Sequence, residues 1–227
     1  MNEYKRVIAI GDIHGQFEKL TDLWKKINFN DKEDFVVFLG DYIDRGERSV
    51  DCLKFIKMVT HFKQNVVALR GNHEDFMLHY FESHSVSSPI DYSEIWLDSN
   101  NGGDKTMREL KRLPPHEVAE LLALVNTFPY YYNNLPSWFF VHAGINPKYG
   151  LYEQPLSDYL WVRNEFLSKY DGNLEMVVGH TPVQYLGSSY DTPVHLQNKI
   201  TMMDTGAAMG KKISALDLVS GTYWQSL

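Results

Sequence analysis

Three stretches in the first third of the chain combine glycine with carboxylate, imidazole and amide side chains. They read Gly-Asp-Ile-His-Gly at 11–15, Gly-Asp-Tyr-Ile-Asp-Arg-Gly at 40–46 and Arg-Gly-Asn-His-Glu at 70–74. Carboxylate oxygen, amide oxygen and imidazole nitrogen together form a ligand set for Mn²⁺, Fe or Zn²⁺, whereas a structural zinc site of the cysteine type would need thiolates. The stretches therefore predict a metal centre with mixed oxygen and nitrogen ligands.

Two histidines later in the chain follow apolar runs in the same way. His142 follows the run 138–141, and His180 follows the run 176–178 after one glycine. Six ligands are too many for one four-coordinate ion, but they suit two ions about 3.5–4 Å apart that share a carboxylate. A water bound by such ions is acidic enough to act as hydroxide near neutral pH. The candidate ligands are Asp12, His14, Asp41, Asn72, His142 and His180.

The runs that precede the three early stretches have the pattern of buried strands. The runs 7–10, 35–39 and 66–69 are short and apolar, and a glycine follows each within two residues. Between them, 17–27 and 49–62 have helical spacing, and this alternation of strand and helix favours parallel strand pairing. Because ligands bind beyond the carboxyl ends of such strands, we expect the polar stretches to meet at one edge of a sheet.

The rest of the chain divides into a helical middle and a last third rich in strands. We interpret residues from about 76 to 127 as a mostly helical insertion within a single domain that spans 1–227, because no flexible linker flanks it. Its helices are predicted at 73–81, 92–97, 104–113 and 117–126. The later strands are predicted at 130–133, 138–141, 176–178, 200–203, 213–218 and 222–224.

The composition suits one soluble α/β domain, with 227 residues, 44% of them hydrophobic and 22% charged. A net charge of -7 argues against nucleic-acid binding, which needs lysine and arginine to neutralise phosphates. A phosphorylated substrate is still compatible, because metal ions supply positive charge locally. No apolar run resembles a signal peptide or a membrane span, so we expect a cytoplasmic location and no membrane partner. Cys52 lies in an apolar run, which favours a buried hydrophobe over a nucleophile.

The three early stretches resemble the signature of the PPP-type phosphoprotein phosphatases, a group within the calcineurin-like metallophosphoesterases. The signature G-D-x-H-G, G-D-x-x-D-R-G and G-N-H-E is intact, and the later His-Ala-Gly and Gly-His resemble its remaining elements. The stretch 96–106, with Asn-Gly-Gly at 101–103, resembles the bacterial and phage branch. The resemblance implies an α/β fold in which a central β-sandwich of mixed sheets is flanked by helices.

The same resemblance implies how the six ligands divide between two divalent ions. Asp41 would bridge the ions, with Mn²⁺ as the first choice of metal and Fe or Zn²⁺ as alternatives. One ion would be held by Asp12, His14 and His180, and the other by Asn72 and His142.

The resemblance also implies roles for residues that do not bind metal. His73 would be the acid that protonates the leaving alkoxide, and Asp44 would hydrogen-bond to His73 and keep it protonated. Arg45, Arg70 and Arg163 would bind phosphate oxygens, which arginine can do through two parallel N–H bonds.

Serine/threonine phosphatase activity is the first expectation for the reaction, with a metal-bound hydroxide attacking phosphorus in line. The bacterial branch also includes enzymes that split dinucleoside polyphosphates such as diadenosine tetraphosphate symmetrically, with the same metal core. The partner is therefore a phosphoprotein or a small phosphorylated substrate, and the helical insertion is expected to line the substrate groove and to select between them. A non-catalytic, metal-stabilised binding module is a third alternative, but no ligand or acid is missing.

Overall fold

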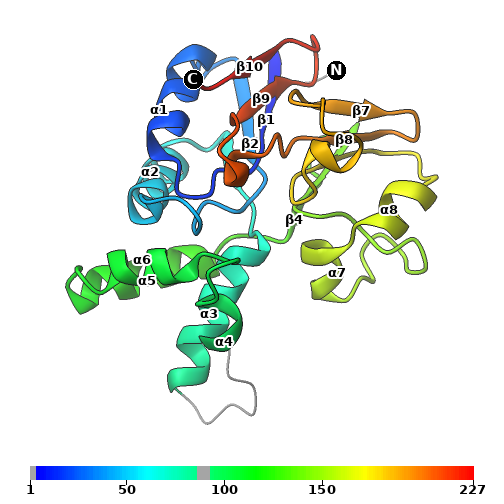
Figure 1. The fold of residues 1–227 in the computed structure, drawn as a ribbon. Helices are drawn as coiled ribbons and strands as arrows, with labels where there is room; N and C mark the ends of the chain where they lie inside the picture. The colour runs from blue at the N-terminus through cyan, green and yellow to red at the C-terminus, as the bar shows by residue number, and fades with distance from the viewer. Residues whose placement is uncertain (1–3, 86–92) are drawn as a thin grey trace.

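Two five-stranded sheets form the centre of the computed structural model, which describes residues 4–85 and 93–227 (Figure 1). The first sheet has the strand order β10-β9-β1-β2-β3, with β1, β2 and β3 parallel and β9 and β10 antiparallel to their neighbours. Its strands are β1 (Arg6–Ile10), β2 (Asp34–Phe38), β3 (Val66–Ala68), β9 (Ser214–Asp217) and β10 (Tyr223–Gln225).

The second sheet has the order β4-β5-β6-β8-β7 and is also mixed. Strands β5, β6 and β8 are parallel, whereas β4 and β7 pair with them in antiparallel orientation at the two edges. Its strands are β4 (Tyr131–Tyr132), β5 (Trp138–Val141), β6 (Glu175–Val178), β7 (Val194–Leu196) and β8 (Ile200–Met202).

The inner faces of the two sheets share one apolar core. Val7 and Val37 from the first sheet pack in the same buried cluster as Phe140 and Val177 from the second. Successive side chains of a strand point to opposite faces, so Ile8, next to Val7, belongs instead to the cluster under the outer helices. The predicted fold, a central β-sandwich of mixed sheets flanked by helices, is confirmed.

Helices cover the outer faces of the sandwich. α1 (Phe17–Ile27) and α2 (Ser49–Phe62) pack on the first sheet, and α7 (Leu156–Trp161) and α8 (Asn164–Lys169) pack on the second. Short 3-10 helices η1 (Val183–Tyr185) and η2 (Ala207–Met209) lie in the connections near the end of the chain. In the described residues, no helix is long and apolar enough to span a membrane.

Four helices from the middle of the chain gather on one side of the sandwich (Figure 1). They are α3 (Asn72–Ser85), α4 (Ser93–Trp96), α5 (Gly103–Leu110) and α6 (Pro115–Asn126). Residue 92 of the helix predicted at 92–97 lies outside the described residues. The interpretation of 1–227 as one domain with an insertion at about 76–127 stays a prediction.

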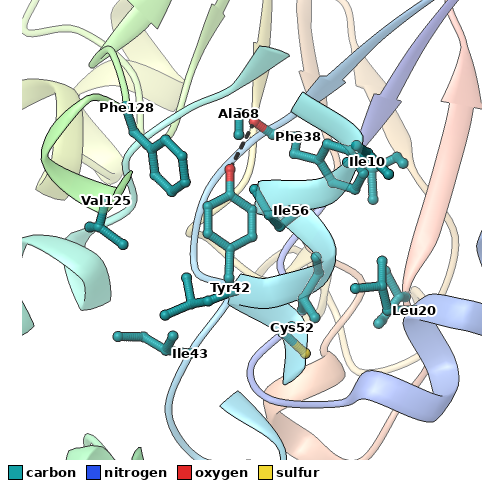
Figure 2. Packing of buried hydrophobic residues seen from close by; sticks show 14 of the residues in the cluster. Ile10, Leu20, Phe38, Tyr42, Ile43, Cys52, Ile56, Ala68, Val125 and Phe128 are labelled. Atoms are coloured by element: carbon teal, nitrogen blue, oxygen red, sulfur yellow. Dashed lines mark hydrogen bonds between the residues drawn. The ribbon is translucent and has the colours of Figure 1, made fainter. Parts of the chain in front are cut away.

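The loop after β2 is anchored at Tyr42, whose side chain is buried in the apolar core between the first sheet and its outer helices. Tyr42 is fully buried there, and its hydroxyl donates to the carbonyl of Leu69 at 2.7 Å. Figure 2 shows Tyr42 packed against Phe128 and Ile56, with Cys52 buried in the same cluster. Burial raises the pKa of the Cys52 thiol well above its ordinary value, as expected of a core residue rather than a nucleophile.

Candidate metal centre

The six predicted ligands converge at one edge of the sandwich, where loops follow β1, β2, β5 and β6 and where α3 begins. All six side chains are buried, although carboxylates and imidazoles are normally exposed unless they have partners. The sequence prediction that these residues meet is confirmed by their contacts. The residues brought together are Asp12, His14, Asp41, Asn72, His142 and His180.

Left-handed backbone geometry aims several of these side chains inward. The φ angles of His14, Asp41, Asp44, Arg45 and His180 lie between 50° and 72°. This region is unfavourable for residues with a Cβ, and it persists only where the surrounding structure enforces it. Such conformations cluster at functional sites, so the loops are shaped for the contacts of their side chains rather than for local backbone preference.

Three hydrogen-bond acceptors face one another at His142. The Nδ1 atom of His142 lies 2.7 Å from the carbonyl oxygen of Leu39, which places the proton of a neutral imidazole on Nδ1. The Nε2 lone pair then points at Asn72 Oδ1, 2.9 Å away, and at Asp41 Oδ1, 3.4 Å away. Three acceptors at these distances repel one another unless a cation lies among them.

His14 repeats this arrangement on the other side of Asp41. Its Nδ1 lies 3.1 Å from the carbonyl oxygen of Ile43, so its Nε2 is free to act as a ligand. Nε2 lies 3.5 Å from Asp41 Oδ2 and 4.0 Å from Asp12 Oδ2. The two oxygens of Asp41 thus face two different imidazoles, as a bridging carboxylate requires.

His180 lies beside His142 rather than beside His14. Its Nδ1 atom is 2.9 Å from Asn72 Oδ1, and Asp41, His142 and His180 form a group with the spacing of metal ligands. Only the backbone N–H of His180 reaches Asp12, at 3.1 Å. The resemblance implied that His180 shares an ion with Asp12 and His14, whereas its imidazole turns toward Asn72 and His142, which favours a place on their side of Asp41.

The electrostatics of the cluster also favour a cation. Burial, reinforced by Asp204 and Asp41, raises the pKa of Asp12 well above its ordinary value. Burial lowers the pKa values of His14 and His142, which keeps both imidazoles neutral. Burial would also raise the pKa of Asp41, but the surrounding imidazoles, when they are protonated, outweigh burial and lower that pKa. Buried carboxylates with neutral imidazoles fit divalent ions, so this donor set suits the group that the sequence implies.

His73 lies at the edge of the cluster, and its second ring nitrogen is held by Asp44. The Nδ1 atom of His73 lies 2.7 Å from Asp44 Oδ2, and its Nε2 atom lies 3.9 Å from Asp41 Oδ2. Burial lowers the pKa of His73, but Asp41 and Asp44 outweigh burial and raise it overall. His73, His14 and Asp41 lie close enough together to hold a metal ion. The hydrogen bond between His73 Nδ1 and Asp44, however, gives the imidazole of His73 a different partner.

A pocket of about 320 Å³ exposes this cluster to solvent. Arg45 and Arg163 line it, together with Trp161, Asn101 and Met209. The Nη1 atom of Arg45 lies 3.5 Å from His14 Nε2. Two of the three predicted phosphate-binding arginines therefore stand beside the candidate metal ligands, and Asn101 is the residue of the helical middle that lines this pocket in the described part of the chain.

Arg70, the third predicted phosphate-binding arginine, points elsewhere. Its Nη2 donates to the carbonyl oxygen of Asn126 at 2.9 Å, and its Nη1 donates to the hydroxyl of Tyr130 at 3.0 Å. Arg70 does not line the pocket. In this arrangement its guanidinium joins the end of α6 to the start of the second sheet rather than facing the pocket, so these contacts give no support to phosphate binding by Arg70, which stays a prediction.

Three further residues support the site, although their roles were not predicted. Glu74 accepts hydrogen bonds from the backbone N–H groups of Asp41 and Tyr42, and Trp96 and Thr106 donate to Asp44. Glu74 ends the third signature stretch, and Trp96 and Thr106 flank the Asn-Gly-Gly at 101–103.

Asp204 lies near the cluster and accepts a hydrogen bond from the backbone N–H of Gly206. The charge of Asp204 helps to raise the pKa of Asp12, and burial raises the pKa of Asp204 itself to about 6. Asp204 therefore adds negative charge beside the cluster.

Comparisons with known proteins agree on the superfamily and differ on the substrate. Asymmetrical bis(5'-nucleosyl)-tetraphosphatase PrpE of Bacillus cereus is 26% identical over 91% of this chain and 88% of its own. Serine/threonine-protein phosphatase 2 of Escherichia coli is 25% identical over 94% and 93%. Symmetrical bis(5'-nucleosyl)-tetraphosphatase of Enterobacter sp. is 30% identical, but over 63% of this chain and 44% of its own.

Solved structures share the fold at lower identity. A candidate diadenosine tetraphosphatase superposes with a TM-score of 0.70 at 19% identity, covering 99% of this chain and 94% of that one. A serine/threonine phosphatase of Saccharomyces cerevisiae has a TM-score of 0.63 at 15% identity, covering 97% and 74%. The calcineurin-like phosphoesterase model matches residues 5–206, nearly the whole chain. With its signature stretches intact and its ligands gathered at one edge of the sandwich, the chain belongs to the calcineurin-like phosphoesterases, in the superfamily of the PPP-type phosphatases.

Proposed function

We propose that the chain is a phosphomonoesterase that removes phosphate from phosphoserine and phosphothreonine, with His73 as the proton donor to the leaving oxygen. The observation that carries this proposal is the buried pair of His73 and Asp44 beside the metal cluster, with Nδ1 and Oδ2 2.7 Å apart. Asp44 holds the ring so that Nε2, rather than Nδ1, faces the cluster and the pocket.

The identity of the leaving group explains why such a pair would be needed. A serine or threonine alkoxide is strongly basic and leaves slowly unless it is protonated, so a placed acid accelerates its departure by about 10²–10⁴-fold. A nucleotide leaving through a phosphate oxygen is weakly basic, since the second pKa of a phosphate is about 6. A histidine held by a buried carboxylate therefore supports an alkoxide leaving group.

The pocket arginines would hold the phosphoryl group in line with that acid. Arg45 and Arg163 both line the pocket that exposes His14, Asn72 and His180. Guanidinium groups bind phosphate oxygens through paired N–H bonds and offset the charge that develops on them. Their role in this proposal is to orient the ester so that its leaving oxygen lies toward His73.

Two metal ions would be held by the six clustered residues, with Asp41 between them. Asp12 and His14 belong to one side, and Asn72, His142 and His180 to the other. When bound, such ions supply positive charge to the phosphoryl oxygens and make a water acidic enough to attack near neutral pH. The oxygen and imidazole donors suit Mn²⁺, with Fe or Zn²⁺ as alternatives.

Hydrolysis of a dinucleoside tetraphosphate is a second candidate function. The relatives that carry this activity in their names are as similar to the chain as the protein phosphatase is. Trp161 is the structural feature that favours it, because its indole is 42% exposed and lines the pocket next to His180. A nucleobase stacks well on such an exposed aromatic ring.

Turnover by Mn²⁺-loaded protein separates the two functions. We expect a higher kcat/KM on a phosphothreonine peptide than on diadenosine tetraphosphate, and faster turnover of the dinucleotide would reject the proposal. Asp41→Asn, prepared in parallel, should be inactive on both substrates and so excludes a contaminating phosphatase. Replacing Trp161 with Ala should weaken dinucleotide hydrolysis more than peptide hydrolysis if the indole binds a base.

A further inference from the structure

Asp44 is a fully buried carboxylate whose hydrogen bonds come largely from a segment far along the chain. Its Oδ2 accepts from Trp96 Nε1 at 2.9 Å as well as facing His73 Nδ1, and its Oδ1 accepts from Thr106 Oγ1 at 2.6 Å. Trp96 and Thr106 are themselves fully buried. In the described part of the chain, no lysine or arginine forms an ion pair with Asp44, so apart from His73 its side chain is held by the neutral donors Trp96 and Thr106.

Residues 96–106, the segment that carries Trp96 and Thr106, also contact Arg45, the neighbour of Asp44 in the loop after β2. The carbonyl of Gly102 accepts from the backbone N–H of Arg45, and a Cβ at Gly102 would lie 2.4 Å from that nitrogen. A Cβ at Gly103 would lie 2.5 Å from Trp96 Nε1. Lys105 Nζ donates to the carbonyl of Arg45 at 2.8 Å. Residues 96–106 thus pack against both Asp44 and Arg45, and the two glycines permit the close approach.

We propose that Trp96 and Thr106 are positioning residues for the proton donor: their two hydrogen bonds fix the carboxylate plane of Asp44 so that Oδ2 faces His73. A carboxylate held by one donor can rotate, whereas donors on both oxygens leave one orientation. The Asn-Gly-Gly stretch then contributes to catalysis, because it lets the indole of Trp96 and the hydroxyl of Thr106 reach the carboxylate of Asp44. This inference rests on the proposed role of His73.

Two substitutions remove the donors. Trp96→Phe removes the indole N–H and keeps a six-membered aromatic ring, although it leaves a gap at a buried position, while Thr106→Val replaces the hydroxyl with a methyl group of similar shape. Thr106→Ser keeps the hydroxyl and serves as the rescue variant. Trp24→Phe and Thr201→Val are matched controls, because Trp24 packs among Phe29, Phe38 and Phe55 and Thr201 is buried in β8.

The readout is the dependence of kcat on the leaving group. A phosphothreonine peptide needs protonation of its leaving alkoxide, whereas p-nitrophenyl phosphate releases a stable phenolate without help. We expect kcat on the peptide to fall about tenfold in Trp96→Phe and in Thr106→Val, the usual size of an outer-shell effect. The fall on p-nitrophenyl phosphate should be several times smaller, with KM and metal content near those of the parent protein.

The controls separate positioning from general damage. Trp24→Phe and Thr201→Val should change the two rates by equal factors, and Thr106→Ser should restore the parent ratio. Equal losses on both esters in Trp96→Phe and Thr106→Val, or no loss at all, would overturn the inference. His73→Asn distinguishes this failure from failure of the proposed function: if it too leaves the ratio unchanged, the acid itself has been misassigned.

Discussion

The carboxylate of Glu74 accepts a hydrogen bond from the backbone N–H of Asp41, with Oε2 2.8 Å from the nitrogen. The same carboxylate also accepts from the backbone N–H groups of Tyr42 and Gly71, at 2.7 and 3.0 Å. It is fully buried, and it ties the loop after β2 to the first turn of α3. The positive φ of Asp41, the bridging ligand of the proposed metal pair, is thus held by a residue that does not face the ions.

Glu74→Gln should therefore weaken metal binding together with stability. The NH₂ group of the glutamine amide would face backbone N–H groups that now donate to a carboxylate oxygen, so these N–H groups would lose their acceptor. An unsatisfied buried group of this kind lowers the free energy of unfolding by about 1–3 kcal/mol. Thermal melts and metal content per chain measure both effects. Glu109→Gln is the matched control, since Glu109 accepts from the backbone N–H groups of Ser49 and Val50. It should lose stability and retain metal; equal metal content in the two variants would contradict the role of Glu74.

The pH dependence of turnover should report the pair of His73 and Asp44. A proton donor works while it is protonated, so activity on alkyl phosphates should fall as pH rises through the raised pKa of His73. Asp44→Asn removes a negative charge that raises this pKa, and the alkaline limb of kcat should move to lower pH. The measurement is a pH profile of kcat at saturating phosphothreonine peptide. An alkaline limb at the same pH in both proteins would remove Asp44 from this role.

The metal ligands could be predicted because each lies close to the end of a strand. A short apolar run, a glycine and a polar side chain are all local features, as in the passage from Ile10 through Gly11 to Asp12. The edge at which the ligands meet then follows from parallel pairing of β1 with β2 and of β5 with β6. Local pattern and sheet topology together identify the ligand set.

Side-chain direction could not be predicted in the same way, because it depends on partners remote in sequence. Arg70 is adjacent to a ligand stretch, but the direction of its guanidinium is set by hydrogen bonds to Asn126 and Tyr130, which lie about 60 positions later in the sequence. The orientation of His180 depends on Asn72, and that of Asp44 depends on Trp96. Strand β7 was missed for a different reason: it has three residues at a sheet edge and lacks an apolar run.

Arg45 and Arg70 should respond differently to substitution although both adjoin signature stretches. Arg45→Lys keeps the charge but loses the paired N–H geometry, so we expect a loss of roughly 10-fold or more in kcat/KM on phosphate esters. Arg70→Gln should instead lower the melting temperature, since it leaves Asp75 and the end of α6 without their partner. Steady-state kinetics and thermal melts on both variants test this. An Arg70→Gln protein with normal stability and tenfold weaker substrate binding would support the role in phosphate binding.

Removal of metal should destabilise the fold, because the converging acceptors repel one another without a cation. Chelation should lower the melting temperature, and Mn²⁺ at 100 times its dissociation constant should restore about 2.7 kcal/mol per site. Asp41→Asn should lose this response, since both oxygens of Asp41 face imidazoles. Asp217→Asn is a control, because Asp217 is buried but bonds to the backbone N–H groups of Val7 and Val219. A melting temperature that is insensitive to Mn²⁺ in the parent protein would contradict the metal site.

Gly103→Ala should damage the protein at a position where alanine would ordinarily help. Gly103 is the first residue of α5 and its φ is not positive, so alanine would normally stabilise the protein by about 0.4–1 kcal/mol, because it restricts the unfolded chain. Here the added Cβ would lie 2.3 Å from the carbonyl oxygen of Trp96 and 2.5 Å from its Nε1. The indole must move, and its hydrogen bond to Asp44 must lengthen or break.

We therefore expect Gly103→Ala to lower the melting temperature and to slow the phosphothreonine peptide more than p-nitrophenyl phosphate, as in Trp96→Phe. Gly187→Ala is the control, because a Cβ there makes only ordinary contacts with Tyr190, at 3.4 Å. Double substitution with Trp96→Phe gives the decisive comparison, since the two changes act on one hydrogen bond and their effects on the rate ratio should not add. Additive effects would mean that Gly103 acts through some contact other than the indole.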